Sequence, residues 1–246
     1  MQTVDLNCDM GEGMNSDHLV MPFITSANIA CGYHAGDAET MATTIRLAVQ
    51  HNVAIGAHPG FNDKPNFGRI PLQLPDSEVY TLVREQIQTL QLYCKQAGAA
   101  LHHVKPHGAL YNMAALNKSL AAAIASAVYD VNPNLILYGL SGSYLISQAA
   151  AKGLQTASEV FADRTYQPDG SLTPRNQPNA LIHDKARAIA QVLQMVQQQK
   201  VISTDGTTIP ITAQTICLHG DGEHAVDFAT AIHQQLIHNH IELKAC

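Results

Sequence analysis

Short apolar runs alternate along this chain with longer segments in which apolar residues recur with the period of an α-helix. The apolar runs cover residues 3–7, 27–30, 53–57, 101–104, 135–140, 156–160 and 215–218. The helical segments cover residues 38–51, 77–97, 117–130, 143–152, 184–199 and 224–238. This order predicts an α/β fold, a parallel sheet covered by helices. About seven strands favour a closed or nearly closed barrel of the TIM type, with a doubly wound open sheet as the alternative.

The composition fits a globular protein and argues against several classes of partner. The chain has 246 residues, of which 46% are hydrophobic and 14% charged, and no Gly/Ser linker divides it, so we expect one domain over 1–246. The net charge of −6 without a Lys/Arg run argues against nucleic acid. No apolar run reaches the roughly 20 residues that span a bilayer. Five scattered cysteines and the absence of a signal-peptide pattern predict a cytoplasmic protein.

Ionisable residues follow almost every expected strand, often beside a glycine that permits a tight turn. They are Asp9, Glu12, His34, Asp37, His58, Lys105, His107, Glu159, Asp163, Arg164, His219 and Asp221. The carboxyl ends of parallel strands form one rim, where ligands bind. Helix capping is the alternative for Asp37 and Asp221 taken singly. Caps do not require histidines or a lysine, so the whole set predicts an active site.

Three of these residues have the ligand chemistry of a metal site. Asp9, His58 and His107 combine a carboxylate with two imidazoles, which suits a divalent ion, although the histidines could also act as acid/base groups without metal. Lys105 is a candidate for binding an anionic substrate group or a developing oxyanion. Its alternative is an ion pair with Glu12 or Asp9.

Several carboxylates are candidates for general acid/base catalysis. Crowding of Glu12, Asp37 and Asp221 would raise at least one pKa towards neutrality. A thiolate nucleophile is disfavoured because no cysteine lies in a local Cys/His motif. The chain has no GxGxxG after its first strand and no GxxxxGK[ST], so it shows no nucleotide-binding signature of its own. The Pro-rich, polar segment 161–182 is predicted to be a long functional loop.

The stretches DLNCDMGEG, ANIACGYHAGD, GAHPGF, FGR, HVKPHGALYN, EVFADRTY and ICLHGD resemble the LamB/YcsF family in sequence and in order. The resemblance implies a seven-stranded β/α barrel related to the glycoside hydrolase/deacetylase barrels, whose metal is typically held by an Asp and two His. It therefore favours Asp9, His58 and His107 as site residues. The chain departs from the family pattern at Asn66, where a Gly is usual, and at Ile70, where a second basic residue often follows FGR.

The resemblance further implies ATP-dependent opening of the lactam of 5-oxo-L-proline to L-glutamate, together with two separately encoded subunits, B and C. We expect the partners to phosphorylate the amide oxygen and this chain to bind the ring or its phosphorylated form and to direct water to it. The expected catalytic residues are Asp9, Glu12, His34, Asp37, Lys105, His107, His219 and Asp221. The expected substrate-binding residues are Asn7, His58, Arg69, Glu159, Asp163 and Arg164. A stand-alone metal-dependent deacetylase or amidohydrolase is the alternative.

Overall fold

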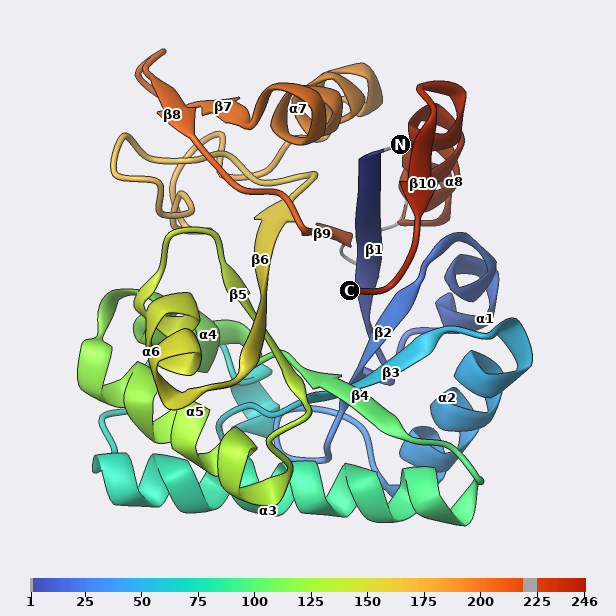
Figure 1. The fold of residues 1–246 in the computed structure, drawn as a ribbon, viewed down its shortest axis with the longest axis vertical. Helices are drawn as coiled ribbons and strands as arrows, with labels where there is room; N and C mark the ends of the chain where they lie inside the picture. Colours follow the sequence, from blue (N-terminus) through green and yellow to red (C-terminus); the bar gives the residue numbers. More distant parts are fainter. Residues whose placement is uncertain (1, 219–224) are drawn as a thin grey trace.

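Seven parallel strands close into a barrel in the computed structural model, which describes residues 2–218 and 225–246. The strands are β1 (Gln2–Met10), β2 (Ser26–Ala30), β3 (Ala54–His58), β4 (Leu101–Val104), β5 (Ile136–Leu140), β6 (Gln155–Phe161) and β9 (Thr215–Leu218). Each strand pairs with the next in this order, and β9 returns to pair with β1. The predicted barrel is confirmed, and the open-sheet alternative is wrong because the β1–β9 pairing closes the sheet (Figure 1).

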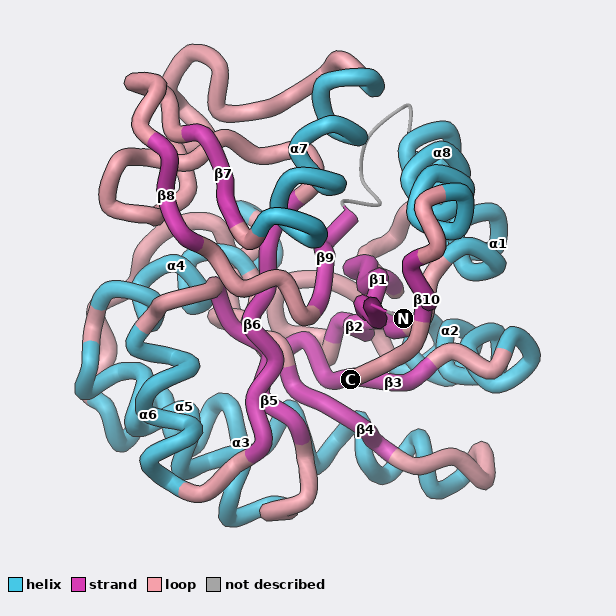
Figure 2. Tube along the Cα trace, turned by 45° about the horizontal axis from the view of Figure 1, so that its top comes forward, coloured by secondary structure: helices cyan, strands magenta, loops and turns pink. Residues whose placement is uncertain are grey.

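Helices surround the barrel strands, as Figure 2 shows. Those expected from the sequence are α2 (Ala38–His51), α3 (Asp76–Gln96), α5 (Lys118–Val131), α6 (Tyr144–Lys152), α7 (Lys185–Gln198) and α8 (Ala225–His238). Four helical elements of the described ranges were not expected: α1 (Asp17–Val20), α4 (Gly108–Leu116) and the 3₁₀ turns η1 (Met21–Phe23) and η2 (Lys64–Asn66). Helix α4 was not predicted because a proline precedes it and a glycine is its first residue, and both residue types usually interrupt regular structure. None of the helices in the described ranges is both long and apolar enough to cross a membrane.

Three short strands lie outside the closed barrel. The strands β7 (Lys200–Ile202) and β8 (Thr208–Pro210) form an antiparallel hairpin, which lies with α7 at one end of the molecule (orange in Figure 1). The strand β10 (Ile241–Leu243) runs parallel to the start of β1 and pairs with it. This pairing places the end of the chain beside its beginning.

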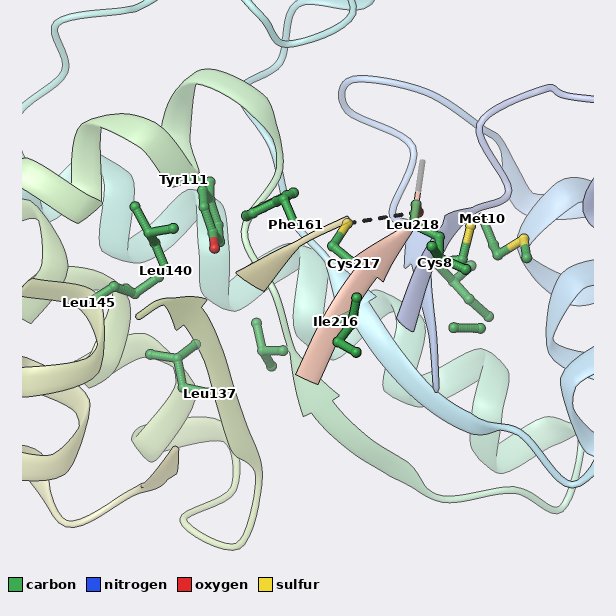
Figure 3. Close-up of a cluster of buried hydrophobic side chains, with 14 of the residues drawn as sticks. Cys8, Met10, Tyr111, Leu137, Leu140, Leu145, Phe161, Ile216, Cys217 and Leu218 are labelled. Carbon is green, nitrogen blue, oxygen red and sulfur yellow. Dashed lines mark hydrogen bonds between the residues drawn. The ribbon is translucent and has the colours of Figure 1, made fainter. Parts of the chain in front are cut away.

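The main apolar core lies between the outer face of the barrel and the helices. Strand β1 contributes to it through the alternate residues Val4, Leu6, Cys8 and Met10, all of which are at most 2% exposed. Alternation with a period of two is what the geometry of a strand requires, because successive side chains point to opposite faces. Figure 3 shows part of this core, where residues of β1, β5 and β9 meet residues of α4 and α6.

The interior of the barrel is largely polar, and it is filled by the other face of the same strands. Asp5 and Asn7 of β1 are fully buried, and Asn7 Nδ2 donates to Glu159 Oε1 of β6 across the barrel at 3.0 Å. His103 of β4 reaches Asn28 of β2 at 2.9 Å, again between strands that are not neighbours. Hydrogen bonds of this kind offset the cost of burying polar groups. The barrel therefore carries a connected polar network that leads up to its carboxyl end.

The segment that links β6 to α7, residues 162–184, contains only isolated bridges in the described structure, Arg164 with Leu181 and Tyr166 with Leu172. The long loop predicted there is confirmed. The Arg164 guanidinium, which is buried, donates to the backbone carbonyl oxygens of Thr173 at 2.6 Å and Ala180 at 3.4 Å. An arginine side chain thus supplies the bonds that a helix or sheet would otherwise provide.

Candidate active site at the carboxyl end of the barrel

A pocket of about 690 Å³ opens above the carboxyl ends of the strands. Its inner end is lined by Asp9, Glu12, His58, Lys105 and His107, which stand at or just after the ends of β1, β3 and β4. Its outer walls are formed by α4 and by loop residues on both sides, including residues of the segment 162–184. These side chains lie close together because the parallel strands of the barrel all end at the same rim.

Four side chains at the inner end form a compact group, which we call the Glu/His cluster: Glu12, His34, His58 and His107. The ligating atoms of these four residues all lie within 4.8 Å of one another. Glu12 Oε1 is 3.2 Å from both His34 Nε2 and His107 Nδ1, and 3.8 Å from His58 Nε2. None of the four side chains is more than 6% exposed. A carboxylate and three imidazoles therefore meet at one point that is almost shielded from water.

Backbone carbonyls fix the tautomers of two of these histidines. His58 Nδ1 lies 2.7 Å from the Lys105 carbonyl oxygen, and His107 Nε2 lies 2.8 Å from the Phe67 carbonyl oxygen. Both nitrogens must carry a proton, since a carbonyl oxygen only accepts. His58 Nε2 and His107 Nδ1 then face each other at 2.9 Å. In the neutral rings both atoms present lone pairs, so a proton or a cation is required between them.

Glycines allow the loops to pack tightly around the cluster. The rings of His34 and His107 stack at a centroid distance of 3.8 Å and an angle of 4°. A Cβ at Gly68 would lie 2.8 Å from His34 Cβ, and one at Gly60 would lie 2.7 Å from His34 Nδ1. Contacts this short exclude any larger residue without movement of the backbone or the histidine. The GAHPGF and FGR stretches thus have a packing reason for their glycines.

Lys105 is buried between two carboxylates next to the cluster. Its Nζ lies 2.9 Å from Asp9 Oδ1 and 2.9 Å from Glu159 Oε1, and it also donates to Cys217 Sγ at 3.1 Å. Burial alone lowers the pKa of Lys105, but the charge of Asp9, with further contributions from Cys217 and Glu159, outweighs it and raises the pKa well above its ordinary value. The lysine is therefore a permanent ammonium. The ion pair with Asp9, one of the alternatives left open by the sequence, is present.

The cluster has a defined charge state. Burial raises the pKa of Glu12, but its close polar contacts with His107 and His34 outweigh it and lower the pKa to about 2. Burial lowers the pKa of His34 to about 3 and also lowers that of His107. At His58 burial lowers the pKa, yet the charge of Asp9 outweighs it and the net shift is upward. Glu12 is thus an anion and the imidazoles of His34 and His107 are neutral, whereas His58 is the histidine of the cluster that accepts a proton most readily.

This donor set fits a divalent metal ion. Neutral imidazoles and a carboxylate are the ligands preferred by Zn²⁺ and by related first-row ions. The carbonyl contacts of His58 and His107 supply the outer-shell orientation that such ligands usually have. The predicted set of Asp9, His58 and His107 differs from this one. Asp9 Oδ2 stays 3.4 Å from His58 Nε2, but Oδ1 accepts from Lys105 and from Asn28, while Glu12 and His34 complete the group.

Some of the remaining predicted residues line the pocket, and others lie behind or beneath the residues that do. Arg69 and Arg164 line the pocket, whereas His34 lies behind His107 and does not. Asn7 and Glu159 are fully buried beneath Lys105 and contact it, so they support the site from within the barrel rather than face a ligand.

Other predicted residues stand apart from the pocket. Asp37 is exposed and caps α2 by accepting from the Thr40 amide at 2.8 Å, which is the capping role left open by the sequence, and it is absent from the described pocket lining. Asp163 is half-buried and is absent from the described pocket lining. His219 and Asp221 lie outside the described residues.

Sequence reasoning missed several residues of the site. Tyr111 lines the pocket and donates to Glu159 Oε2 at 2.6 Å, and Figure 3 shows it near Phe161. Asn28 Nδ2 links Asn7 and Asp9 at 2.8 and 2.9 Å. Arg175 lines the outer part of the pocket. The alternation of polar residues in β1 and β2 was the signal that could have identified Asn28. Arg175 lies in the middle of a loop, where no sequence periodicity could have identified it.

The fold and the site together define a parallel β/α-barrel protein with a buried Glu/His cluster and a lysine–carboxylate pair at the carboxyl end of the barrel. The chain belongs to the LamB/YcsF family, whose model matches residues 4–246. It is 55% identical over 250 residues to a protein of Shouchella clausii (strain KSM-K16) that is named as the A subunit of 5-oxoprolinase, with 100% of this chain and 99% of the relative covered.

Two solved structures have folds similar to that of this chain. The lactam utilization protein from Thermus thermophilus superposes with a TM-score of 0.94 at 39% identity, with all of both chains covered. A family 4 carbohydrate esterase from Streptomyces lividans superposes with a TM-score of 0.50 at 14% identity, covering 98% of this chain and 91% of the esterase. The second likeness concerns the fold alone, and it agrees with the predicted relation to deacetylase barrels.

Proposed function

We propose that this chain is the A subunit of a 5-oxoprolinase, which hydrolyses the lactam of 5-oxo-L-proline to L-glutamate. The observation that carries the proposal is the pocket in which Lys105, paired with Asp9, adjoins the Glu/His cluster. Amide hydrolysis requires a base for the attacking water and a positive environment for the oxygen that becomes negative. The names of the relatives supply the substrate, a cyclic amide.

The reaction is coupled to ATP, which we assign to a complex of this chain with two partner subunits, B and C. The described pocket lacks a phosphate-binding loop of the GxxxxGK[ST] type, as the sequence also does, so the partners are the better candidates for the phosphorylating step. They would deliver 5-oxo-L-proline with a phosphorylated amide oxygen. The need for ATP also assigns the reaction to the cytoplasm.

Within this chain, Asp9 is the best-placed general base. Its side chain is 13% exposed, it lines the pocket, and it lies outside the Glu/His cluster. Asp9 accepts a proton from water as the water adds to the ring carbon, and it passes this proton to the ring nitrogen. The proton of the new hydroxyl follows to the nitrogen by way of Asp9 when the C–N bond breaks, which leaves an amine and an acyl phosphate. A second water then hydrolyses the acyl phosphate to give glutamate and phosphate. Lys105 holds Asp9 in place and stabilises negative charge on the neighbouring oxygen.

We also propose that Glu12, His34, His58 and His107 hold a divalent cation. When bound there, such an ion would act as a Lewis acid towards a substrate oxygen. Metal analysis of the purified chain, before and after dialysis against a chelator, tests this assignment without any assay of activity. His58→Ala and Glu12→Gln should each lower the bound metal, whereas Asp37→Asn, at the exposed cap of α2, should retain it. Equal metal content in all four proteins would contradict the site.

The central experiment measures ATP-dependent release of glutamate from 5-oxo-L-proline, with each of the three subunits omitted in turn. We expect release only from the complete mixture. Asp9→Asn in this chain should lower the rate by about 10²–10⁴, the usual contribution of a general base. Full activity from the two partners alone would overturn the proposal.

A stand-alone deacetylase or amidohydrolase is the alternative that the same preparations test. It predicts hydrolysis of N-acetyl or lactam substrates by the isolated chain without ATP. That activity, combined with no glutamate release from the complete mixture, would favour the alternative.

A further inference from the structure

The inner end of the pocket is acidic among the residues described. Three carboxylates gather there, Asp9, Glu12 and Glu159, and the ammonium of Lys105 is placed between two of them. With the divalent cation proposed for the Glu/His cluster, the three carboxylates are balanced by that ion and by Lys105, so the inner end has no surplus positive charge. A buried ammonium whose charge is matched by two carboxylates can stabilise a partial negative charge that develops on an adjacent substrate oxygen, but it has little remaining attraction for a fully ionised group. This charge balance argues against the expectation that Lys105 binds the anionic group of the substrate.

The outer part of the same pocket is basic. Arg69, Arg164 and Arg175 line it, whereas the carboxylates of the described lining, Asp9 and Glu12, belong to the inner end. Arg69 and Arg175 are exposed, and Arg164 is buried in the wall formed by the segment 162–184. The pocket therefore has an acidic floor and basic outer walls.

Two of these arginines influence each other directly. Burial, and then the charge of Arg175, lower the pKa of Arg164 to about 10. Both arginines line the pocket, so an anion bound between their guanidinium groups would relieve this repulsion. The surrounding lining residues Gln167, Asn176 and Gln177 add side-chain amide donors. Guanidinium groups are the preferred ligands for carboxylate and phosphate because they donate two parallel hydrogen bonds.

We infer that Arg164 and Arg175 form an oxyanion-binding subsite in the outer part of the pocket, and that it holds the anionic group of the ligand while the reacting amide lies towards Asp9 and Lys105. The inference rests on the proposed function for the identity of the amide. The shared chemistry is an anionic oxygen group, and it has two sources in the reaction: the carboxylate of 5-oxo-L-proline and the phosphoryl group added to the ring.

Calorimetric titration of the isolated chain distinguishes these sources. The ligands are 5-oxo-L-proline, the uncharged lactam 2-pyrrolidinone, and inorganic phosphate. The variants are Arg175→Gln and Arg175→Lys, with Arg46→Gln as the matched control, because Arg46 is an exposed arginine on α2 that donates to Thr43. Arg175 is exposed, so its substitution should leave the fold intact, and circular dichroism and thermal unfolding verify this for each protein.

If the subsite binds the carboxylate, 5-oxo-L-proline binds more tightly than 2-pyrrolidinone, and Arg175→Gln removes about tenfold of that preference. If it binds the phosphoryl group, Arg175→Gln weakens phosphate binding about tenfold and leaves the preference between the two lactams unchanged. In either case we expect Arg175→Lys to weaken binding of the anionic ligand less than Arg175→Gln does. Arg46→Gln should bind all three ligands as the wild type does. Binding of all three ligands at wild-type strength by Arg175→Gln would overturn the inference, as would absence of binding by the wild-type chain up to millimolar concentration. Glutamate release by the complete complex would leave the proposed function standing in either case.

Discussion

The two sides of the pocket are built by different means. At the inner end, backbone hydrogen bonds join the loops that follow β3 and β4, from the His107 amide to the Pro59 carbonyl at 2.8 Å and from the Ala109 amide to the Gly68 carbonyl at 3.0 Å. On the outer side, residues 174–177 are exposed, and side chains such as Arg164 organise the segment 162–184. The reacting groups thus stand on the barrel itself, whereas the proposed anion subsite stands on a loop.

This difference has an energetic meaning. Opening the inner end would break these backbone bonds and the buried ion pairs by which Lys105, after β4, joins Asp9 of β1 and Glu159 of β6, so its stability should be coupled to that of the whole barrel. The loop segment rests on a small number of side chain to backbone bonds, each contributing about 0.5–1.5 kcal/mol when both partners are neutral and more when one is charged. It can therefore open locally while the barrel remains folded, which suits entry of a ligand or docking of a partner.

The largest effect should come from Lys105→Met at the inner end. Removal of the ammonium leaves the buried carboxylates of Asp9 and Glu159 without their shared cation, and we expect a loss of about 3–5 kcal/mol in the free energy of unfolding. Denaturation by urea, followed by circular dichroism, measures it. Lys95→Met, at an exposed position on α3, is the control and should stay within about 0.5 kcal/mol of the wild type.

A triple variant sharpens this test. Lys105→Met combined with Asp9→Asn and Glu159→Gln removes the unpaired charges and should recover much of the lost stability, because replacing a whole buried ion pair is often nearly neutral. Glutamate formation with the partner subunits should remain absent. If Lys105→Met alone unfolds at the wild-type urea concentration, the inner end does not depend on its ion pairs as described.

Gly68→Ala should have the next largest effect. Gly68 has a φ of +61°, and its Cβ would approach His34 Cβ to 2.8 Å, so the substitution combines backbone strain with displacement of the His34–His107 stack. Gly98→Ala is a matched control, since Gly98 has a φ of +70° but nothing within 4 Å of its Cβ. We expect a loss of about 1 kcal/mol at Gly98 and about 2–4 kcal/mol at Gly68. Equal losses in thermal unfolding would show that the close contact is unimportant.

Much of the barrel could be predicted because strands and helices have local signals. The alternation of apolar runs with helical periods indicated the seven barrel strands and six of the helices to within a few residues. The strand β10 and the hairpin β7–β8 are only three residues long in each strand, too short for a period to emerge. Helix α4 was missed since its packing against the barrel overrides the local signals of Pro106 and Gly108.

The sequence predicted where in the fold the candidate site lies, but not how its side chains contact one another. Residues that follow the strands converge at the carboxyl end, and this follows from the topology alone. Which carboxylate joins the histidines depends on turns such as that at Gly11, which has a φ of +70°, and on long-range bonds such as Lys105 to Asp9. Those contacts exist only after the barrel has closed. The exposed capping position of Asp37 likewise became clear only in three dimensions.

On the outer side, Arg164→Met should loosen the loop with little effect on the barrel. The variant deprives the Thr173 and Ala180 carbonyls of their guanidinium donor. Hydrogen exchange should increase in the segment 162–184 by about one to two orders of magnitude, which corresponds to about 1.5–3 kcal/mol of local stability for bonds from a charged donor. Arg187→Met, an exposed position in the first turn of α7, should not change the exchange. Faster exchange spread equally over the barrel strands would show that loop and barrel unfold together.

The smallest effect expected is at Gln191, which ties the start of this loop to α7. Gln191 Nε2 lies 3.1 Å from the Phe161 carbonyl oxygen and 2.9 Å from that of Arg164. Gln191→Leu keeps the apolar part of the side chain but removes these donors, and we expect a loss of about 1 kcal/mol, seen mainly as faster exchange near Arg164. Gln197→Leu, an exposed position on the same helix, is the control. A loss in Gln191→Leu as large as that in Lys105→Met would contradict the distinction between the two sides, because it would make the outer loop as integral to the fold as the buried ion pairs.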